Sequence, residues 1–409
     1  MELRPILSTL RRHKLTSWLL ILEIALTCAI VCNAVFMIGQ RLQRMDMPSG
    51  IAEHQVVLVR MAYIGDRSDA DALARNDLAA LRQIPGVQQV ALSIALPFAP
   101  GGPSGGLKLH PQQQQDTLSI SEYYGQNLLP TLGVKLIAGR AFQPDEYVGV
   151  DAVVAALHGG DLKGLPQTVI ISKAVAERLW PGQSALGKTI YFGKDIPFRV
   201  VGVLDRLTRS GQLYLGAGYS MMLPVSINLN FGGGYVLRCA PQDRERVLKA
   251  AVAKLKQIDS RRVVLQADTY DQLRHEFFAN DRAMAGILVG VILALLIITA
   301  LGIVGLASFW VSQRRRMIGV RRELGATRGD ILRYFQTENF LLATIGIALG
   351  MVLAYGINLF LMLHYELPRL PAIYFPVGAI TLWVIGQLAV LGPALRAAAV
   401  PPVVATRSV

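Results

Sequence analysis

The stretch WPGQSALGKT (180–189) has the spacing of a phosphate-binding loop, G-x-x-x-x-G-K-T, in Gly182, Gly187, Lys188 and Thr189. A P-loop follows a strand and opens a helix, whose free N–H groups point at the phosphates. Here the order is reversed. Residues 171–180 have helical periodicity, with Ser172 suited to cap the start, whereas residues 190–204 alternate as a strand does. No acidic strand of the Walker B kind accompanies the match. We therefore interpret it as a helix–turn–strand corner and expect no nucleotide site.

Cysteines and one carboxylate are the other candidates for chemistry. Cys28 and Cys32 are four residues apart, on one helix face, without a His or acidic partner nearby. This spacing favours small packing residues over a metal pair, and Cys239 has no obvious partner. Glu23 lies inside an apolar run, where a carboxylate is costly. Its alternatives are a packing or dimer contact, pairing with an Arg, and a proton or substrate role. We expect no catalytic, metal or cofactor site.

Four apolar runs dominate the composition, which is 52% hydrophobic and only 17% charged. They cover residues 17–39, 283–311, 336–363 and 373–391. Each reaches the roughly 18 residues that a membrane-spanning helix needs. The first run is longer than the roughly 7–15 residues of a signal-peptide core, so we interpret it as a retained anchor.

The net charge of +13 follows the membrane topology. Residues 41–282 hold 27 Lys and Arg against 22 Asp and Glu, so most of the excess lies in the short segments beside the apolar runs. Those basic residues are Arg4, Arg11, Arg12, Lys14, Arg314, Arg315, Arg316, Arg321, Arg322, Arg328, Arg333, Arg396 and Arg407. Basic short loops stay in the cytoplasm. Both termini and the 312–335 loop are therefore predicted inside and 41–282 outside, and a nucleic-acid partner is disfavoured.

The outer region is predicted to be an α+β domain of two lobes. Strand–helix–strand patterns stand at both of its ends, in residues 55–94 and 234–267. Two such units predict a split βαβ sheet, into which a β-rich lobe of roughly residues 95–230 is inserted. Residues 269–284 are predicted to form a helix that continues unbroken into the second span. The fold class is therefore a four-helix membrane protein with this domain between helices 1 and 2.

The segment between the second and third spans is the most informative. Apolar residues stand among its charges, followed by Gly325-Ala326-Thr327 and then a second helical pattern from Arg328. This pattern predicts a short amphipathic helix, a glycine hinge and an interfacial helix that leads into the third span. One interpretation is a basic loop that touches anionic lipid. The other is a docking helix for a cytoplasmic partner.

MIGVRRELGATRGDI (317–331) resembles the pattern E-I-G-I-R-R-A-L-G-A-x-R-x-D-I of the MacB/FtsX-like permease family, the membrane subunits of mechanotransmission (type VII) ABC systems. The matching residues are Gly319, Arg321, Arg322, Leu324, Gly325, Ala326, Arg328, Asp330 and Ile331. Met317 stands where an acid is usual, and Glu323 where a small residue is usual. Residues 10–26, 129–142, 169–204 and 393–407 also resemble the family, so the likeness covers nearly the whole chain.

The resemblance implies a non-catalytic permease of the bacterial inner membrane with a periplasmic domain. A cytoplasmic ABC ATPase would bind ATP and dock at the inner loop, on Ile318, Gly319, Val320, Arg321, Arg322, Leu324, Gly325 and Ala326. The chain ends soon after the fourth span, so we expect a separate polypeptide to supply the ATPase. The other implied partners are a second permease copy or a paralogue, membrane lipid, and a periplasmic adaptor with an outer-membrane channel.

The implied function is export of a peptide, an antibiotic or another amphiphile, driven by ATP-dependent movement of the outer domain. The alternative is FtsX-like signalling to a cell-wall hydrolase or sensor, or lipoprotein release. The expected segments are an N-terminus with helix 1 (1–40), a two-lobed domain with stalk (41–282), helix 2 (283–311), a coupling loop (312–335), helix 3 (336–363), a short periplasmic loop (364–372), helix 4 (373–393) and a tail (394–409).

Overall fold

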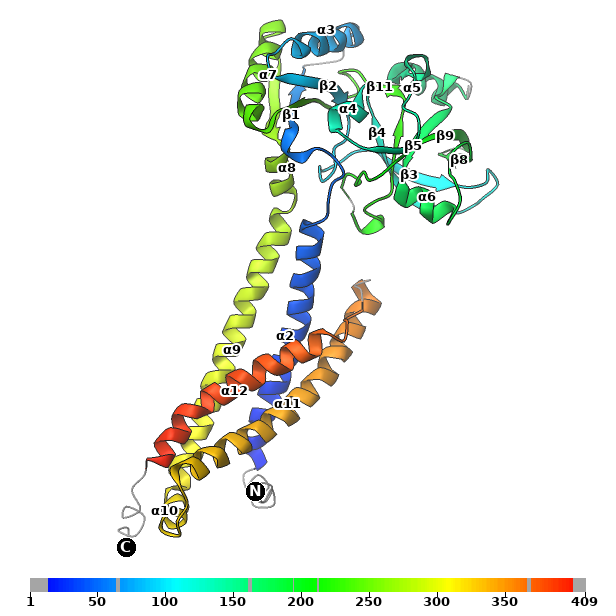
Figure 1. Ribbon diagram of the computed structural model, residues 1–409. Helices are drawn as coiled ribbons and strands as arrows, with labels where there is room; N and C mark the ends of the chain where they lie inside the picture. Colours follow the sequence, from blue (N-terminus) through cyan, green and yellow to red (C-terminus); the bar gives the residue numbers. More distant parts are fainter. Residues whose placement is uncertain are drawn as a thin grey trace. The chain divides into compact units, whose positions relative to one another are not determined.

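The computed structural model describes residues 14–63, 67–160, 164–193, 195–211, 213–365 and 369–399. Its elements, labelled in Figure 1, form two compact units. The membrane unit comprises Met1–Asp46 and Asn280–Val409, and the outer domain comprises Met47–Ala279. The basic residues predicted inside near the chain ends, Arg4, Arg11, Arg12 and Arg407, lie outside the described residues.

Within the described residues, four helices are long and apolar enough to cross a membrane. They are α2 (Lys14–Met45), α9 (Ala279–Gln313), α11 (Arg328–Tyr365) and α12 (Tyr374–Ala398). A shared apolar core joins them, and α2 contributes Cys28 and Cys32 to it. All three cysteines of the chain are free and buried. The Sγ of Cys28 lies 3.9 Å from the Ile347 carbonyl of α11, so these thiols pack helix against helix, as the sequence predicts.

Helix α9 is much less enclosed within the chain than α2. Its buried residues are Asp281, Thr299, Ile303, Ala307, Trp310 and Val311. Polar contacts among the described residues join it to α2, and Arg44 lies 3.8 Å from Asp281 in one of them. The hydroxyls of Thr27 and Thr299 lie 2.8 Å apart, and Arg41 donates to Asp281 at 2.6 Å. Most of the apolar surface of α9 is left for lipid or another protein to cover.

The first lobe of the outer domain is a four-stranded antiparallel sheet in the order β13-β1-β12-β2. Its elements are β1 (Val56–Ala62), α3 (Ala70–Arg82), β2 (Val87–Ser93), β12 (Gly234–Cys239), α7 (Arg244–Ile258) and β13 (Val263–Thr269). Each helix links two parallel strands that have one antiparallel strand between them, which is a split βαβ arrangement. Apolar residues of the strands and of both helices form one core.

An ion pair is buried completely in this lobe. Asp77 of α3 accepts from Arg262, just before β13, at 2.8 Å, and neither side chain has exposed area. The hydroxyl of Tyr235 on β12 donates to the same carboxylate. Three segments that are far apart in sequence are thereby fixed to one another.

The inserted lobe contains a seven-stranded sheet in the order β5-β9-β7-β10-β4-β3-β8, in which β8 also pairs with β9. Its strands are β3 (Ser104–Lys108), β4 (Leu118–Tyr124), β5 (Leu136–Gly139), β7 (Thr168–Ser172), β8 (Thr189–Phe192), β9 (Ile196–Leu204) and β10 (Ser220–Leu223). Six of the strands therefore pair in a closed ring, and β5 lies outside it. Side chains from the ring and from α5 (Val150–Gly159) and α6 (Lys173–Leu179) form the core of this lobe.

The segment with the P-loop spacing is a corner between α6 and β8. The hydroxyl of Ser172 accepts from the backbone N–H of Val175 and caps α6, as predicted. Lys188 donates to Gln183 at 2.6 Å and lies 5.0 Å from the Trp180 ring, so its ammonium is held locally. The glycine-rich turn enters a strand and opens no helix, so it lacks the N-terminal N–H groups that bind phosphate in a P-loop.

The single helix predicted for residues 269–284 is wrong, because the structure has two helices there. Helix α8 (Tyr270–Phe277) ends at Phe277, Phe278 is its C-cap, and α9 begins at Ala279. The Phe278 ring is buried and packs 5.1 Å from the ring of Phe98. Packing of this side chain into the outer domain interrupts a sequence that is otherwise suited to a continuous helix.

Candidate functional site: the inner coupling loop

The loop between α9 and α11, which the sequence predicts to lie inside, is joined to the membrane helices by a buried ion pair. Arg314, the residue after α9, donates to Glu338 of α11 at 2.8 and 3.1 Å. The guanidinium also lies 5.6 Å from the Trp310 ring, and both charged side chains are buried. The sequence pattern had not been interpreted as a pairing of these two residues. The sequence did contain a signal for this pair, because Glu338 lies just inside one predicted span and Arg314 lies at the end of the preceding one.

Helix α10 (Arg315–Glu323) lies against the inner ends of α11 and α12. Ile318 is its main buried apolar side chain, 3% exposed. The cluster around it comprises Val311, Ile331, Phe335, Ala394, Ala397 and Ala398. One face of α10 is therefore packed inside the membrane unit, and the opposite face is open.

Hydrogen bonds define both the end of α10 and the start of α11 at the turn between them. Gly325 adopts φ +98°, a conformation that side-chain-bearing residues rarely take. The N–H of Ala326 bonds to the Arg321 carbonyl at 3.0 Å, in the manner of a Schellman motif. Thr327 and Asp330 then form a reciprocal cap, because each side chain accepts from the other's backbone N–H, at 2.9 and 3.2 Å. The predicted hinge is thus a hydrogen-bonded corner.

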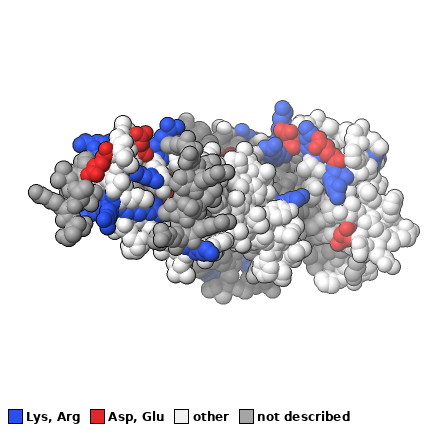
Figure 2. Space-filling model, turned by 90° about the horizontal axis from the view of Figure 1, so that it is seen from below, with Lys and Arg blue, Asp and Glu red and all other residues white. Residues whose placement is uncertain are grey.

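The open face of α10 combines apolar and basic side chains. Leu324 is 83% exposed, and Val320 and Met317 are 46% and 40% exposed. Arg315 and Arg316 are exposed as well. Figure 2 shows Lys and Arg side chains gathered at the end of the membrane unit that carries α10, with fewer acidic ones among them. Such a mixture suits a protein surface or an anionic lipid surface.

The eight predicted docking residues divide by burial. Ile318 and Gly319 are buried, so their role in this structure is packing. Arg321 is partly covered, with its guanidinium 4.9 Å from the Tyr334 ring, and Arg322 donates to the Ala398 carbonyl at the end of α12. The residues whose side chains or backbone remain open are Val320, Leu324, Gly325 and, in part, Ala326.

Glu23 lies in the membrane unit, well away from this loop in sequence. Its carboxylate is beside Gly302 of α9, where an added Cβ would lie 2.6 Å from an oxygen of the carboxylate. Neither a hydrogen bond nor an ion pair to Glu23 occurs among the described residues. The Thr27–Thr299 contact lies one turn further along the same two helices. Glu23 therefore occupies a close approach of α2 and α9.

Two family models match the chain. The MacB-like periplasmic core domain matches residues 17–257, and the FtsX-like permease C-terminal domain matches residues 289–402. A macrolide export ATP-binding/permease protein, MacB 1/2, of Paracoccus denitrificans (strain Pd 1222) is 26% identical over 366 residues. That alignment covers 87% of this chain and 51% of the relative. The chain thus spans about half the length of the curated relatives it matches first.

The chain is also similar to a second curated permease and to a solved periplasmic region. An uncharacterized ABC transporter permease, YvrN, of Bacillus subtilis (strain 168) is 26% identical over 260 residues, covering 60% of this chain and 63% of that protein. Among solved structures, the periplasmic region of MacB from Actinobacillus actinomycetemcomitans aligns with a TM-score of 0.33 at 18% identity, covering 56% of this chain and 97% of that one. By the two family models, which together span most of its length, the chain belongs to the MacB/FtsX-like ABC transporter permeases.

Proposed function

We propose that this chain is the permease subunit of a MacB-like export system in the bacterial inner membrane. A separate cytoplasmic ATPase binds and hydrolyses ATP, and its closure moves the periplasmic domain to expel a peptide, an antibiotic or another amphiphile. The relatives named for macrolide export support this function. The observation that carries it is the form of α10, which is packed on one face and open on the other.

The contacts of the loop suit it to transmit movement. Arg314 and Glu338 join the start of α10 to α11, and Arg322 joins its end to α12. The capped corner at Thr327 fixes the direction in which α11 leaves. A partner that displaces α10 would therefore also displace the adjoining ends of α9, α11 and α12, because these contacts tie α10 to all three helices.

The other partners and residues follow from the same proposal. ATP would be bound by the partner, and this chain would hold no cofactor. A second permease copy, or a paralogue, would cover part of the open surface of α9. A periplasmic adaptor and an outer-membrane channel would complete the path. We assign Glu23 a packing role at the α2–α9 contact, because it lies directly against Gly302.

The proposal is tested by placing charge on the open face of α10. Leu324→Asp combined with Val320→Asp should abolish co-purification of an ABC ATPase from native membranes, with companions identified by mass spectrometry. Leu265→Asp, at an exposed apolar residue of β13, is the matched control and should retain the ATPase. Ile318→Asp is unsuitable, because a charge there would disrupt the packed face.

Retention of the ATPase by the double variant would overturn the docking role of α10. ATP hydrolysis by the purified chain alone would overturn the assignment of catalysis to a partner. The co-purified proteins also distinguish the alternative functions. An adaptor supports export, whereas a cell-wall hydrolase in its place supports FtsX-like signalling. Release of lipoproteins would support the third alternative.

A further inference from the structure

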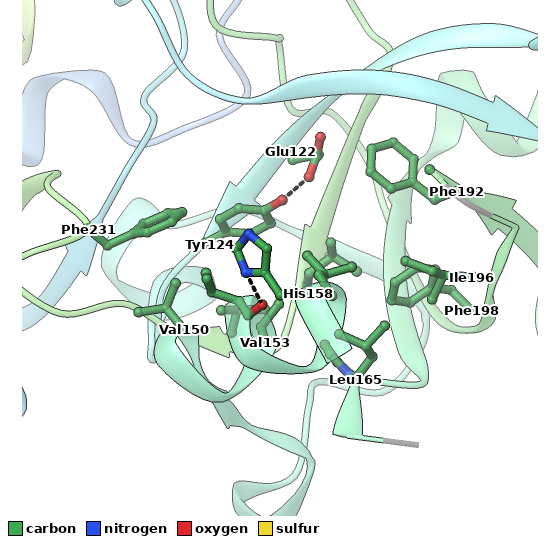
Figure 3. Close-up of a pocket in the computed structure, with 16 residues that line it drawn as sticks. Glu122, Tyr124, Val150, Val153, His158, Leu165, Phe192, Ile196, Phe198 and Phe231 are labelled. Carbon is green, nitrogen blue, oxygen red and sulfur yellow. Dashed lines mark hydrogen bonds between the residues drawn. The ribbon is translucent and has the colours of Figure 1, made fainter. Parts of the chain in front are cut away.

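The inserted lobe contains a cavity of about 490 Å³ between its sheet and helix α5. This volume falls within the roughly 300–1,000 Å³ range of small-molecule sites. Its walls are mainly aliphatic and aromatic, and three phenylalanines contribute to them: Phe192, Phe198 and Phe231. Figure 3 shows these rings and the valines of α5 around the same space. An apolar molecule of moderate size would fit here.

A carboxylate lies on the apolar face that lines this cavity. Side chains alternate along a strand, so Leu118, Ile120, Glu122 and Tyr124 of β4 share one face. Leu118 and Ile120 belong to the core of the lobe. Glu122 stands where the pattern calls for a third apolar residue, and it is only 4% exposed. A buried carboxylate on a core-facing strand position is costly unless something compensates it.

The described residues compensate Glu122 only in part. The Tyr124 hydroxyl donates to its Oε2, as Figure 3 shows, and Oε1 accepts no hydrogen bond from any described residue. The side chain of the described cavity lining that can carry positive charge is His158, whose Nδ1 is 2.9 Å from the Val154 carbonyl. The remaining described lining residues are uncharged. No Lys or Arg of the described chain forms an ion pair with Glu122.

We propose that this cavity binds a small apolar molecule that carries one protonated amine, with the ammonium at Glu122 and the apolar body between α5 and the phenylalanines. The inference goes beyond the proposed function, since binding here requires neither an ATPase nor export. An ammonium supplies the donors that the free carboxylate oxygen lacks. A carboxylate ligand would repel the ionised form of Glu122, and an alcohol brings no positive charge to favour that form.

Proton release should accompany binding. Burial raises the pKa of Glu122 to about 8, so its carboxyl is mostly protonated at pH 7 in the empty cavity. An ammonium favours the ionised form. Binding of an amine at pH 7 should therefore release close to one proton from the protein, whereas binding of a neutral analogue should release none.

The test uses three probes of one shape: 4-phenylbutylamine, 4-phenylbutan-1-ol and 4-phenylbutanoate. Each is titrated into the full chain in nanodiscs by calorimetry, with empty nanodiscs as background. Repeating the amine titration in phosphate and in Tris measures the protons released, because the two buffers differ in ionisation enthalpy. The wild-type chain should bind the amine at least tenfold more tightly than either analogue at pH 8.

Three variants locate the binding. Glu122→Gln keeps the shape of the side chain and should weaken the amine at least tenfold, abolish proton release and leave the alcohol within about twofold. Val153→Trp, at a lining residue of α5, should weaken all three probes. Glu177→Gln, at an exposed glutamate of α6, is the matched control and should change nothing.

Two results would overturn the proposal. One is the absence of binding by any probe above the nanodisc background. The other is equal binding of amine and alcohol by the wild-type chain, without proton release. Because both are measured on the wild-type chain, they remain decisive even if a variant fails to fold. ATPase co-purification is a separate readout, so failure here is distinguishable from failure of the proposed function.

Discussion

The two lobes of the outer domain each bury a carboxylate, but they surround it differently. Asp77 in the four-stranded lobe is enclosed with Arg262 and accepts from Tyr235. Glu122 in the inserted lobe accepts from Tyr124 beside an apolar cavity and has no basic partner among the described residues. The first carboxylate is matched within the fold. The second leaves a charge to be neutralised by a proton or by a ligand, which is the difference between a structural group and a binding group.

Breaking the matched pair should give the largest effect. Arg262→Met leaves Asp77 buried without a cation and should destabilise the four-stranded lobe by about 3–5 kcal/mol. Cys239 of β12 is fully buried, so its rate of maleimide labelling in increasing urea reports opening of this lobe.

The matched control for that prediction removes both charges. Adding Asp77→Asn to Arg262→Met should recover at least half of the lost stability, because the amide oxygen still accepts from Tyr235. If the single and double variants label Cys239 at equal rates, the stability lost in Arg262→Met does not come from an uncompensated Asp77 charge. The contrast drawn between Asp77 and Glu122 would then be wrong.

The unmatched carboxylate should reveal itself through pH. The pKa of Glu122 is about 8 in the folded protein, above the usual carboxyl value of about 4.3. The folded state therefore holds a proton that the unfolded state lacks between these values, so the free energy of unfolding falls as pH rises from about 4.3 and levels off above about 8. Glu122→Gln has no such dependence. At pH 9 it should exceed the wild-type stability by up to roughly 5 kcal/mol, while near pH 4 the two should be similar.

Hydrogen exchange of the β4 and α5 segments measures this difference in the lobe concerned. Glu177→Gln serves again as the control and should follow the wild-type chain at every pH. Parallel pH profiles for the wild type and Glu122→Gln would mean that the charge of Glu122 is already neutralised in the folded protein, which would contradict the contrast with Asp77.

The smallest expected effect concerns Tyr124. Tyr124→Phe removes the hydroxyl that donates to Glu122 and should cost about 0.5–1.5 kcal/mol. The cost should be larger at pH 9, where the carboxyl is ionised, and it should vanish in a Glu122→Met background, which has no oxygen to accept the bond. A double-mutant cycle at both pH values measures this coupling; a zero coupling energy would contradict it.

Local patterns in the sequence account for much of the fold. The four apolar runs predict the four long helices, and the order of periodicities around Lys188 distinguishes a strand entry from a P-loop. The break at Phe278 was not predictable in this way, because its cause is a contact with Phe98, 180 residues earlier. The pairing of Asp77 with Arg262 is equally non-local.

The candidate site shows the same division. Its helix, its glycine corner and the Thr327 cap are visible in the sequence, because capping depends on neighbours in the chain. Which side of α10 is open is not visible, since Ile318 and Leu324 are both apolar and differ only in what lies against them. Glu122 did leave a signal, as a charge in an otherwise apolar strand face, although only the structure shows a cavity beside it.

The closed ring of the inserted lobe limits how copies of this chain can aggregate through their strand edges. An unpaired strand edge can recruit a strand from another molecule and so begin aggregation. Within the described part of this sheet, β5 is the strand that lies outside the ring, and it is only four residues long, with Lys135 and Arg140 at its ends. A membrane surface packed with copies of this chain therefore offers the inserted lobes little backbone through which to polymerise.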